Sequence, residues 1–76
     1  MTLGVMIKKA REKKGMTQAQ LGRKIGIRSD ASAQVVISRY ERDITFPEGN
    51  LMKLVAALKL PKKKVMKMAM SAMWSA

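Results

Sequence analysis

Apolar side chains recur at steps of three and four residues near the start of the chain, which is the spacing of one face of an α-helix. The spacing is followed by Leu3, Met6, Ile7 and Ala10, and Gly15 comes after lysines that favour the carboxyl end of a helix. The pattern predicts a first helix that buries this apolar stripe and exposes its basic side chains.

A second, shorter helix is predicted over residues 18–25 by its start and stop signals. Thr17 is a suitable N-cap, and Gln20 three residues later completes the pairing of a capping box. Gly26 tolerates a positive φ, so it can end this helix in a tight turn. The apolar positions of the segment are Ala19, Leu21 and Ile25, followed by Ile27 in the turn.

A small polar stretch at residues 28–32 predicts a loop before a third helix. Asp30 and Ser32 are both able to cap that helix, and we favour Ser32, with the helix running to about residue 41 or 42. Helical spacing divides its side chains into two faces. The inner face holds Val36, Ile37 and Tyr40, and the outer face holds Gln34, Val35, Ser38 and Arg39.

Two more helices are expected after an extended connection over residues 43–47, in which Pro47 disfavours a helical Phe46. The fourth helix starts at residue 48 or 50, ends at residue 59, and buries Leu51, Leu54, Val55 and Leu58. Pro61 suits the first turn of a fifth helix. One face of this helix carries Val65, Met68, Ala69, Ala72 and Met73. The pattern predicts a compact all-α domain of five helices over residues 1–76, with residues 61–76 as its C-terminal helix.

The composition excludes most catalytic chemistry. The 76 residues include no cysteine and no histidine, so disulfides, thiolate metal sites and histidine-dependent catalysis are ruled out. Five acidic residues leave little for carboxylate chemistry, and we expect no enzymatic activity, metal, cofactor or small-molecule ligand. No apolar run approaches the roughly 18 residues that span a bilayer, and the start lacks the order of a signal peptide. We therefore expect a cytoplasmic protein that begins naturally at Met1.

The net charge indicates a polyanionic partner. Sixteen lysines and arginines against five acidic residues give a net charge of +11. This lies well above the magnitude of about 2–8 that suits an ordinary small domain. Such a field favours nucleic acid or an anionic membrane surface. The alternative is a basic surface that is merely solvated.

The second and third helices, with a glycine in the turn, form the helix-turn-helix arrangement. Its crossing needs a small residue, which Gly22 provides, and an apolar side chain that locks the pair, which Ile37 provides. The chain resembles the helix-turn-helix repressors of lambda-like phages, including their Cro proteins and bacterial relatives. The resemblance is carried by MTQAQLG at 16–22, IGI at 25–27, ISRYER at 37–42, and then by Pro47, Leu51, Leu54, Ala57 and Leu58. It spans about residues 3–60 and implies a lambda-repressor-like fold that binds double-stranded DNA.

One segment departs from the family pattern. The family's turn is shorter, and this chain carries about five extra residues, 28–32, between Gly26 and the recognition helix. Either the loop is longer and lies along the DNA backbone, or the recognition helix gains a turn at its N-terminus. The choice decides which side chains reach the bases.

The resemblance places the third helix in the major groove, with its N-terminal half over the base edges. Gln34 lies where the family reads bases and can pair with adenine, Val35 can meet a thymine methyl group, and Arg39 can bind guanine. Ser38 can bond a base or a phosphate. The alternatives are solvated or marginally packed surface positions, and for Arg39 a phosphate contact.

Contacts with the DNA backbone are expected around this helix. In the family, the residue at Gln18 clamps a phosphate at a helix start, whereas Thr17 is more a cap than a contact. The other expected backbone contacts are Arg28 and Ser29 in the extra segment, and Arg42 and Thr45 in the loop after the third helix. A solvated loop is the alternative for the last two.

Two further features concern stability and assembly. The resemblance implies a partly buried, structural ion pair between Arg11 and Glu41, and the alternative is two exposed charges that never meet. Exposed apolar side chains on the last helix usually mark an interface, and a two-fold dimer matches a palindromic site. The candidate interface residues are Met66, Met70, Met73 and Trp74.

We therefore expect a dimeric transcription repressor that reads a palindromic operator in a bacterial cell or a phage-infected bacterium, associated with the nucleoid. The alternative is an antitoxin of the same class, in which the apolar tail binds a toxin protein and the complex regulates its own operon. A third hypothesis is a peptide of the membrane surface, built on the basic, methionine-rich helices.

Overall fold

The computed structural model describes residues 2–74, and side chains are described as far as Met70. All regular structure within these residues is helical, as predicted. The helices are α1 (Leu3–Lys13), α2 (Gln18–Lys24), α3 (Asp30–Glu41), α4 (Leu51–Leu58) and α5 (Lys62–Trp74). The last begins one residue after Pro61, so this proline precedes the first turn of α5 instead of lying in it.

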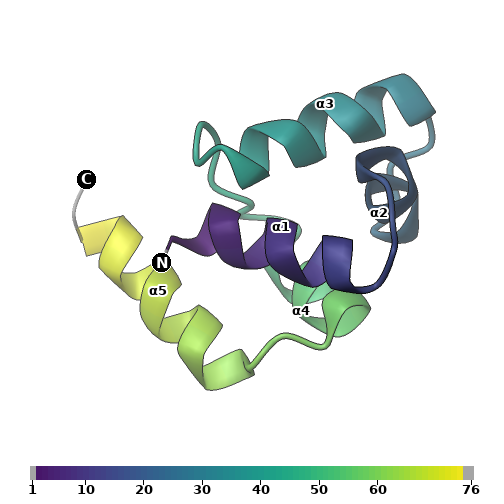
Figure 1. Ribbon diagram of the computed structural model, residues 1–76. Coiled ribbons are helices and arrows are strands. Elements are labelled where there is room, and N and C mark those ends of the chain that lie inside the picture. Colours follow the sequence, from purple (N-terminus) through teal and green to yellow (C-terminus); the bar gives the residue numbers. More distant parts are fainter. Residues whose placement is uncertain (1, 75–76) are drawn as a thin grey trace.

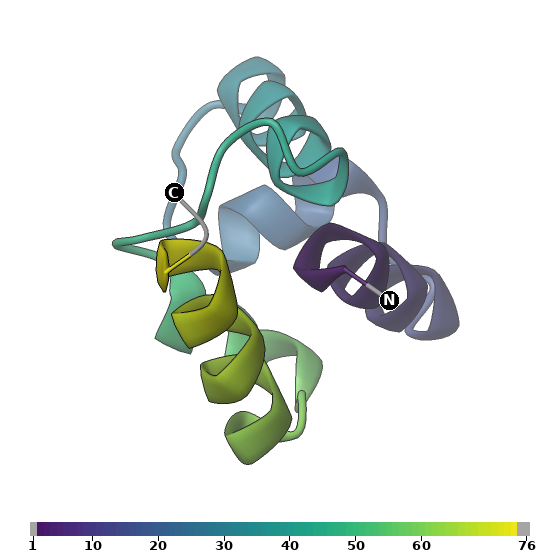
Figure 2. The same ribbon diagram turned by 90° about the vertical axis from the view of Figure 1, so that its left-hand side faces the viewer.

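The helices form two groups around α1. Figure 1 shows α1 beneath α3, with α2 beside the N-terminal end of α3. The other two helices, α4 and α5, lie on the side of α1 that faces away from α3. A quarter turn leaves α3 and the start of α5 at opposite ends of the molecule (Figure 2). One face of α3 is therefore left free of other helices.

The core is built from one apolar stripe per helix, and the predicted stripe residues are buried or partly buried as far as side chains are described; Ala72 and Met73, predicted on the stripe of α5, lie beyond that part. Each helix contributes one of the largest fully buried side chains, which are Ile7, Leu21, Ile37, Leu54 and Val65. Each such side chain stabilises the fold by about 1.5–3 kcal/mol relative to an exposed one. Because residues of all five helices meet in this cluster, the orientation of α3 depends on the whole core.

The start of α2 has the predicted capping box. The Thr17 hydroxyl accepts a hydrogen bond from the Gln20 backbone N–H at 3.1 Å, and the Gln20 side chain accepts one from the Thr17 N–H at 2.8 Å. Gly26 adopts a φ of +103° in the turn after α2, where a side chain would be strained. These two features fix where α2 begins and where the chain turns toward α3.

The crossing of α2 and α3 is close because of Gly22. A Cβ atom added there would lie 2.7 Å from the Ala33 Cα atom and closer still to the Ala33 Cβ atom. These two helices make the most extensive packing of any pair in the described residues. The small residue predicted at the crossing is confirmed, and Ala33 of α3 is its partner.

The start of α3 differs from the prediction. Ser29, not Ser32, is the N-cap, and its hydroxyl accepts a hydrogen bond from the Ser32 backbone N–H at 3.4 Å. The helix begins at Asp30, whose carboxylate suits the positive end of the helix dipole and lies 3.7 Å from the Arg23 guanidinium. Of the two outcomes expected for the extra segment, the structure has the added helical turn.

The connection after α3 also differs from the extended segment expected there. Asp43 adopts a left-handed conformation with a φ of +57°. Its carboxylate accepts hydrogen bonds from the Thr2 hydroxyl at 2.7 Å and from the Gly4 backbone N–H at 3.0 Å. A Cβ atom at Gly4 would lie 2.5 Å from the Glu41 carbonyl oxygen. The end of α3 is thus joined directly to the start of α1.

Candidate nucleic-acid interface

The outer face of α3 carries the four side chains predicted to read bases. Gln34, Val35 and Arg39 are exposed, and Ser38 is half-buried. Ile37, one position away from Ser38, is fully buried, and Val36 is packed against the core. The inner side chains therefore hold α3 in place, and its outer side chains are free to contact a partner.

An ion pair beneath this helix anchors its C-terminal end to α1. The Arg11 guanidinium donates to both carboxylate oxygens of Glu41, at 2.6 Å and 3.2 Å, and to the Met16 carbonyl oxygen at 2.8 Å. The exposed fraction of the side chain is 11% for Arg11 and 3% for Glu41. Hydrogen bonding to Glu41 raises the pKa of the Arg11 guanidinium above its ordinary value. The structure thus contains the structural ion pair that the resemblance implies.

The side chain of Gln18 is tied to the same pair. Its Nε2 atom donates to the Glu41 carboxylate at 3.1 Å, so α1, α2 and α3 share one polar cluster. The side chains of Thr17 and Gln20 each accept a hydrogen bond from the backbone N–H of the other residue, which agrees with a capping role for Thr17. A phosphate contact by Gln18 thus has to come from its backbone N–H or from the second hydrogen of the amide, because Glu41 already accepts the first.

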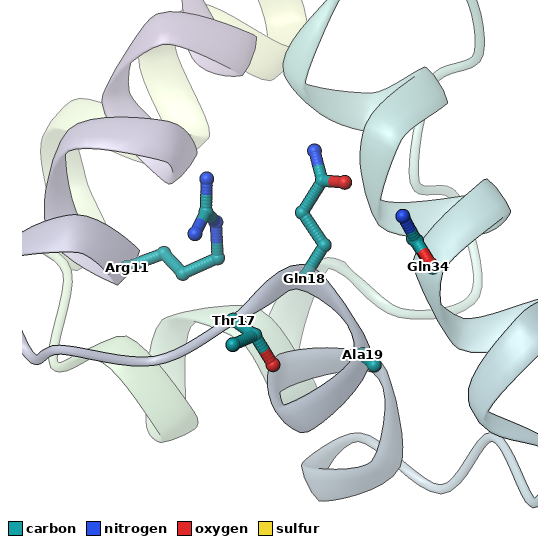
Figure 3. A pocket seen from close by; sticks show the side chains of 5 residues that line it. All are labelled: Arg11, Thr17, Gln18, Ala19 and Gln34. Atoms are coloured by element: carbon teal, nitrogen blue, oxygen red, sulfur yellow. The ribbon is translucent and has the colours of Figure 1, made fainter.

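An open hollow lies where these three helices meet. It is lined by Arg11, Thr17, Gln18, Ala19 and Gln34. Figure 3 shows the side chains of Arg11 and Gln18 in the space between α1 and α3, above the start of α2, with Gln34 on the α3 side of this space. The hollow therefore joins the expected phosphate contact at α2 to the expected base contact at α3, over one continuous polar surface.

The remaining predicted backbone contacts lie at the two ends of α3. Arg28 and Ser29 precede its first turn, whereas Arg42 caps its last turn and Thr45 follows in the loop; all four are exposed. The Ser29 hydroxyl is engaged as the helix cap, and Arg42 Nε donates to the Ser38 carbonyl oxygen at 3.4 Å. The basic side chains thus flank the helix, while its first turns hold no lysine or arginine.

The predicted interface on α5 is described in part. Met66 and Met70 are 44% and 56% exposed, one helical turn apart on the same stripe. The side chains of Met73 and Trp74 lie outside the described residues. Two methionines of α5 are therefore large apolar groups at the surface.

Sequence reasoning missed three residues that position the interface. Asp43 and Gly4 join α3 to α1, and Asp30 joins α3 to α2 through Arg23. A glycine within the first predicted helix, as at Gly4, is a sign that another segment of the backbone approaches closely, and this sign was present in the sequence. The contact of Asp43 with α1 crosses 39 residues of sequence, and no local pattern indicates it.

Comparison with known proteins agrees with this geometry. The helix-turn-helix family model matches residues 7–64, which include α2, α3 and the turn between them. The chain therefore belongs to the Cro/C1-type helix-turn-helix family, and it is a DNA-binding regulator of that class. Neither the comparison with curated proteins nor that with solved structures gave a match.

A membrane-spanning helix and a metal-binding cluster are both absent from the part of the chain that the structure describes. None of its helices has both the length and the apolar character needed to cross a membrane. No cluster of acidic side chains in the same residues is suited to hold a metal ion.

Proposed function

We propose that this protein is a dimeric transcription repressor that reads a palindromic operator by placing α3 in the major groove. The observation that carries the proposal is the division of α3 into a buried inner face and an exposed outer face of Gln34, Val35 and Arg39. A helix held in this way by its own core, with its outer side unoccupied, fits a groove about 12 Å wide. The net charge of +11 supplies the attraction to phosphate.

Selection of bound duplexes from random sequence tests this proposal. We expect two half-sites whose centres are one helical turn apart, because each subunit presents one α3. Gln34→Ala and Arg39→Ala are each expected to cost about 1–3 kcal/mol of binding free energy and to relax preference at one position. Affinity is measured by fluorescence anisotropy at several salt concentrations.

A matched control separates reading of bases from general attraction. Lys62→Ala removes a positive charge from α5, whose start lies at the opposite end of the molecule from α3 (Figure 1). We expect this variant to keep the same selected sequence. Selection of a single unpaired motif, or of no motif, would contradict a dimer on a palindrome.

The dimer contact is proposed on α5. Met66 and Met70 form a stripe one helical turn long, and a two-fold axis through α5 would bury the stripe of each copy against the other. Methionine side chains adapt to irregular surfaces and are frequent at contacts of this kind. A second copy is favoured over a toxin protein because two-fold symmetry also supplies the second α3 that a palindrome needs.

Sedimentation equilibrium tests the dimer. Met70→Lys is expected to shift the protein to monomer and to weaken operator binding, because a charge on the stripe would be buried without a partner. Met52→Lys on α4 is the control; Met52 is 47% exposed and lies outside the proposed contact, so this variant stays dimeric. A wild-type protein that is monomeric alone and forms a stable complex with the product of an adjacent gene would favour the antitoxin function.

A further inference from the structure

The added turn at the start of α3 is capped by a side chain and lies against α2. Ser29 caps it, Asp30 lies 3.7 Å from Arg23 of α2, and Ala33 is fully buried against Gly22. The packing of Ala33 against Gly22 therefore sets the position of this turn relative to α2. Side chains on its outward side are accordingly preorganised for contact with a partner.

The outward side of this turn continues the exposed stripe of the helix. Ala31, Val35 and Ser38 follow one another at steps of four and three, which places them on one line along α3. Ala31 is exposed, and Val35 is 48% exposed. No lysine or arginine lies between Arg28 and Arg39, although the chain carries sixteen of them. The centre of the outer face is thus small, uncharged and largely apolar.

We propose that Ala31 and Val35 together read the C5-methyl groups of two thymines in each half-site. This inference rests on the proposed function, and it names the base chemistry that the same face recognises. The thymine methyl is the apolar group that base pairs display in the major groove, so it is the partner that a small apolar stripe fits. The side chains of Ala31 and Val35 have no hydrogen-bond donor, so these two side chains are not suited to bind phosphate.

The spacing of the two side chains sets the spacing of the thymines. Residues four apart on a helix are about 6 Å apart along its axis. Base pairs are stacked about 3.4 Å apart, so the two methyl groups are expected about two base steps from each other. Without the added turn, Ala31 would not lie on the helix, and a single side chain, Val35, would make this contact.

Replacement of thymine by deoxyuridine in the selected operator tests the inference, because it removes the methyl group and leaves the base pairing intact. For the wild-type protein, we expect two thymine positions in each half-site at which replacement by deoxyuridine lowers the affinity about 4-fold. This is the equivalent of one buried methyl group at about 0.8 kcal/mol. In Val35→Ser the effect of the replacement at one thymine position disappears, and in Ala31→Gly, which removes the Cβ atom, the effect at the other position disappears. Gln34→Ala is the matched control, because its affinity should still fall when either thymine is replaced by deoxyuridine.

The outcomes separate this inference from the proposed function. A selected palindrome whose thymines can all be replaced by deoxyuridine without loss overturns the inference and leaves the proposed function standing. The inference is overturned in the same way if Val35→Ser and Ala31→Gly lose as much affinity on replacement by deoxyuridine as the wild type does. Failure to select any sequence overturns the proposed function and this inference with it. Circular dichroism of each variant shows that the helical fold is kept.

Discussion

Replacement of Glu41 by alanine is expected to lower the free energy of unfolding by about 3–5 kcal/mol. The substitution leaves the guanidinium of Arg11 without its carboxylate in a site where 11% of the side chain is exposed, and it removes the acceptor of the Gln18 amide. A chain of 76 residues is stable by about 4–11 kcal/mol in total, at 0.05–0.15 kcal/mol per residue. Urea unfolding followed by circular dichroism measures the loss, which is a large share of this total.

Two further variants show that the loss comes from the unpaired charge. Glu12→Ala removes an exposed carboxylate of the same helix as Arg11 and is expected to change stability by less than about 0.5 kcal/mol. Arg11→Met combined with Glu41→Leu removes both charges and is expected to recover most of the loss, because apolar pairs of similar volume often replace buried ion pairs without cost. A double variant as unstable as Glu41→Ala would contradict this account of the pair.

The same pair predicts how stability depends on pH. Pairing raises the pKa of Arg11 in the folded protein, so its contribution is present at neutral pH and is lost only as pH rises through the strongly alkaline range. We therefore expect no loss of stability from this group between neutral and mildly alkaline pH, as measured by urea unfolding across that range.

Gly22→Ala is expected to destabilise the fold by about 1–3 kcal/mol, the usual range for overpacking. The added Cβ atom would lie 2.7 Å from the Ala33 Cα atom, which belongs to the backbone and cannot rotate away. The two helices must separate, and α3 then shifts relative to the rest of the domain. Operator affinity, measured at a temperature where the variant is folded, should therefore fall as well.

Gly49→Ala is the matched control for this prediction. Nothing lies within 4 Å of a Cβ atom built at Gly49, and its φ is not in the left-handed region. The variant should keep the affinity of the wild type and match or slightly exceed its stability, by up to about 1 kcal/mol. Equal behaviour of the two alanine variants would show that the close crossing of α2 and α3 does not control binding.

The sequence predicted those parts of the fold that local patterns determine. Apolar spacing located all five helices, and the pairing of Thr17 with Gln20 located the start of α2. The small size of Gly22 indicated the helix crossing, although the sequence did not identify Ala33 as its partner. Each of these features depends on residues close together in the sequence, or on a requirement that few residue types meet.

Other features depend on tertiary contacts that no local pattern records. Ser29 and Ser32 are equally good caps by residue type; Ser29 is the cap in the structure, where Asp30 of the added turn lies 3.7 Å from Arg23 of α2. The side chain of Gln18 faces Glu41 because α3 brings that carboxylate to it, across 23 residues of sequence. The sequence predicted which of residues 34–39 lie on the outer face of α3. It did not predict that Ala31 also lies on this face, because that depends on the added turn.

The most direct test of the account is whether the outer face of α3 lies in the major groove. The measurement is nuclear Overhauser contacts between the methyl groups of Val35 and the protons of the selected operator, in a complex with labelled protein. We predict contacts from Val35 to major-groove protons of the bases, with none to DNA from the exposed methyl group of Met52 on α4. Contacts to DNA from Met52 instead, with none from Val35, would contradict the account.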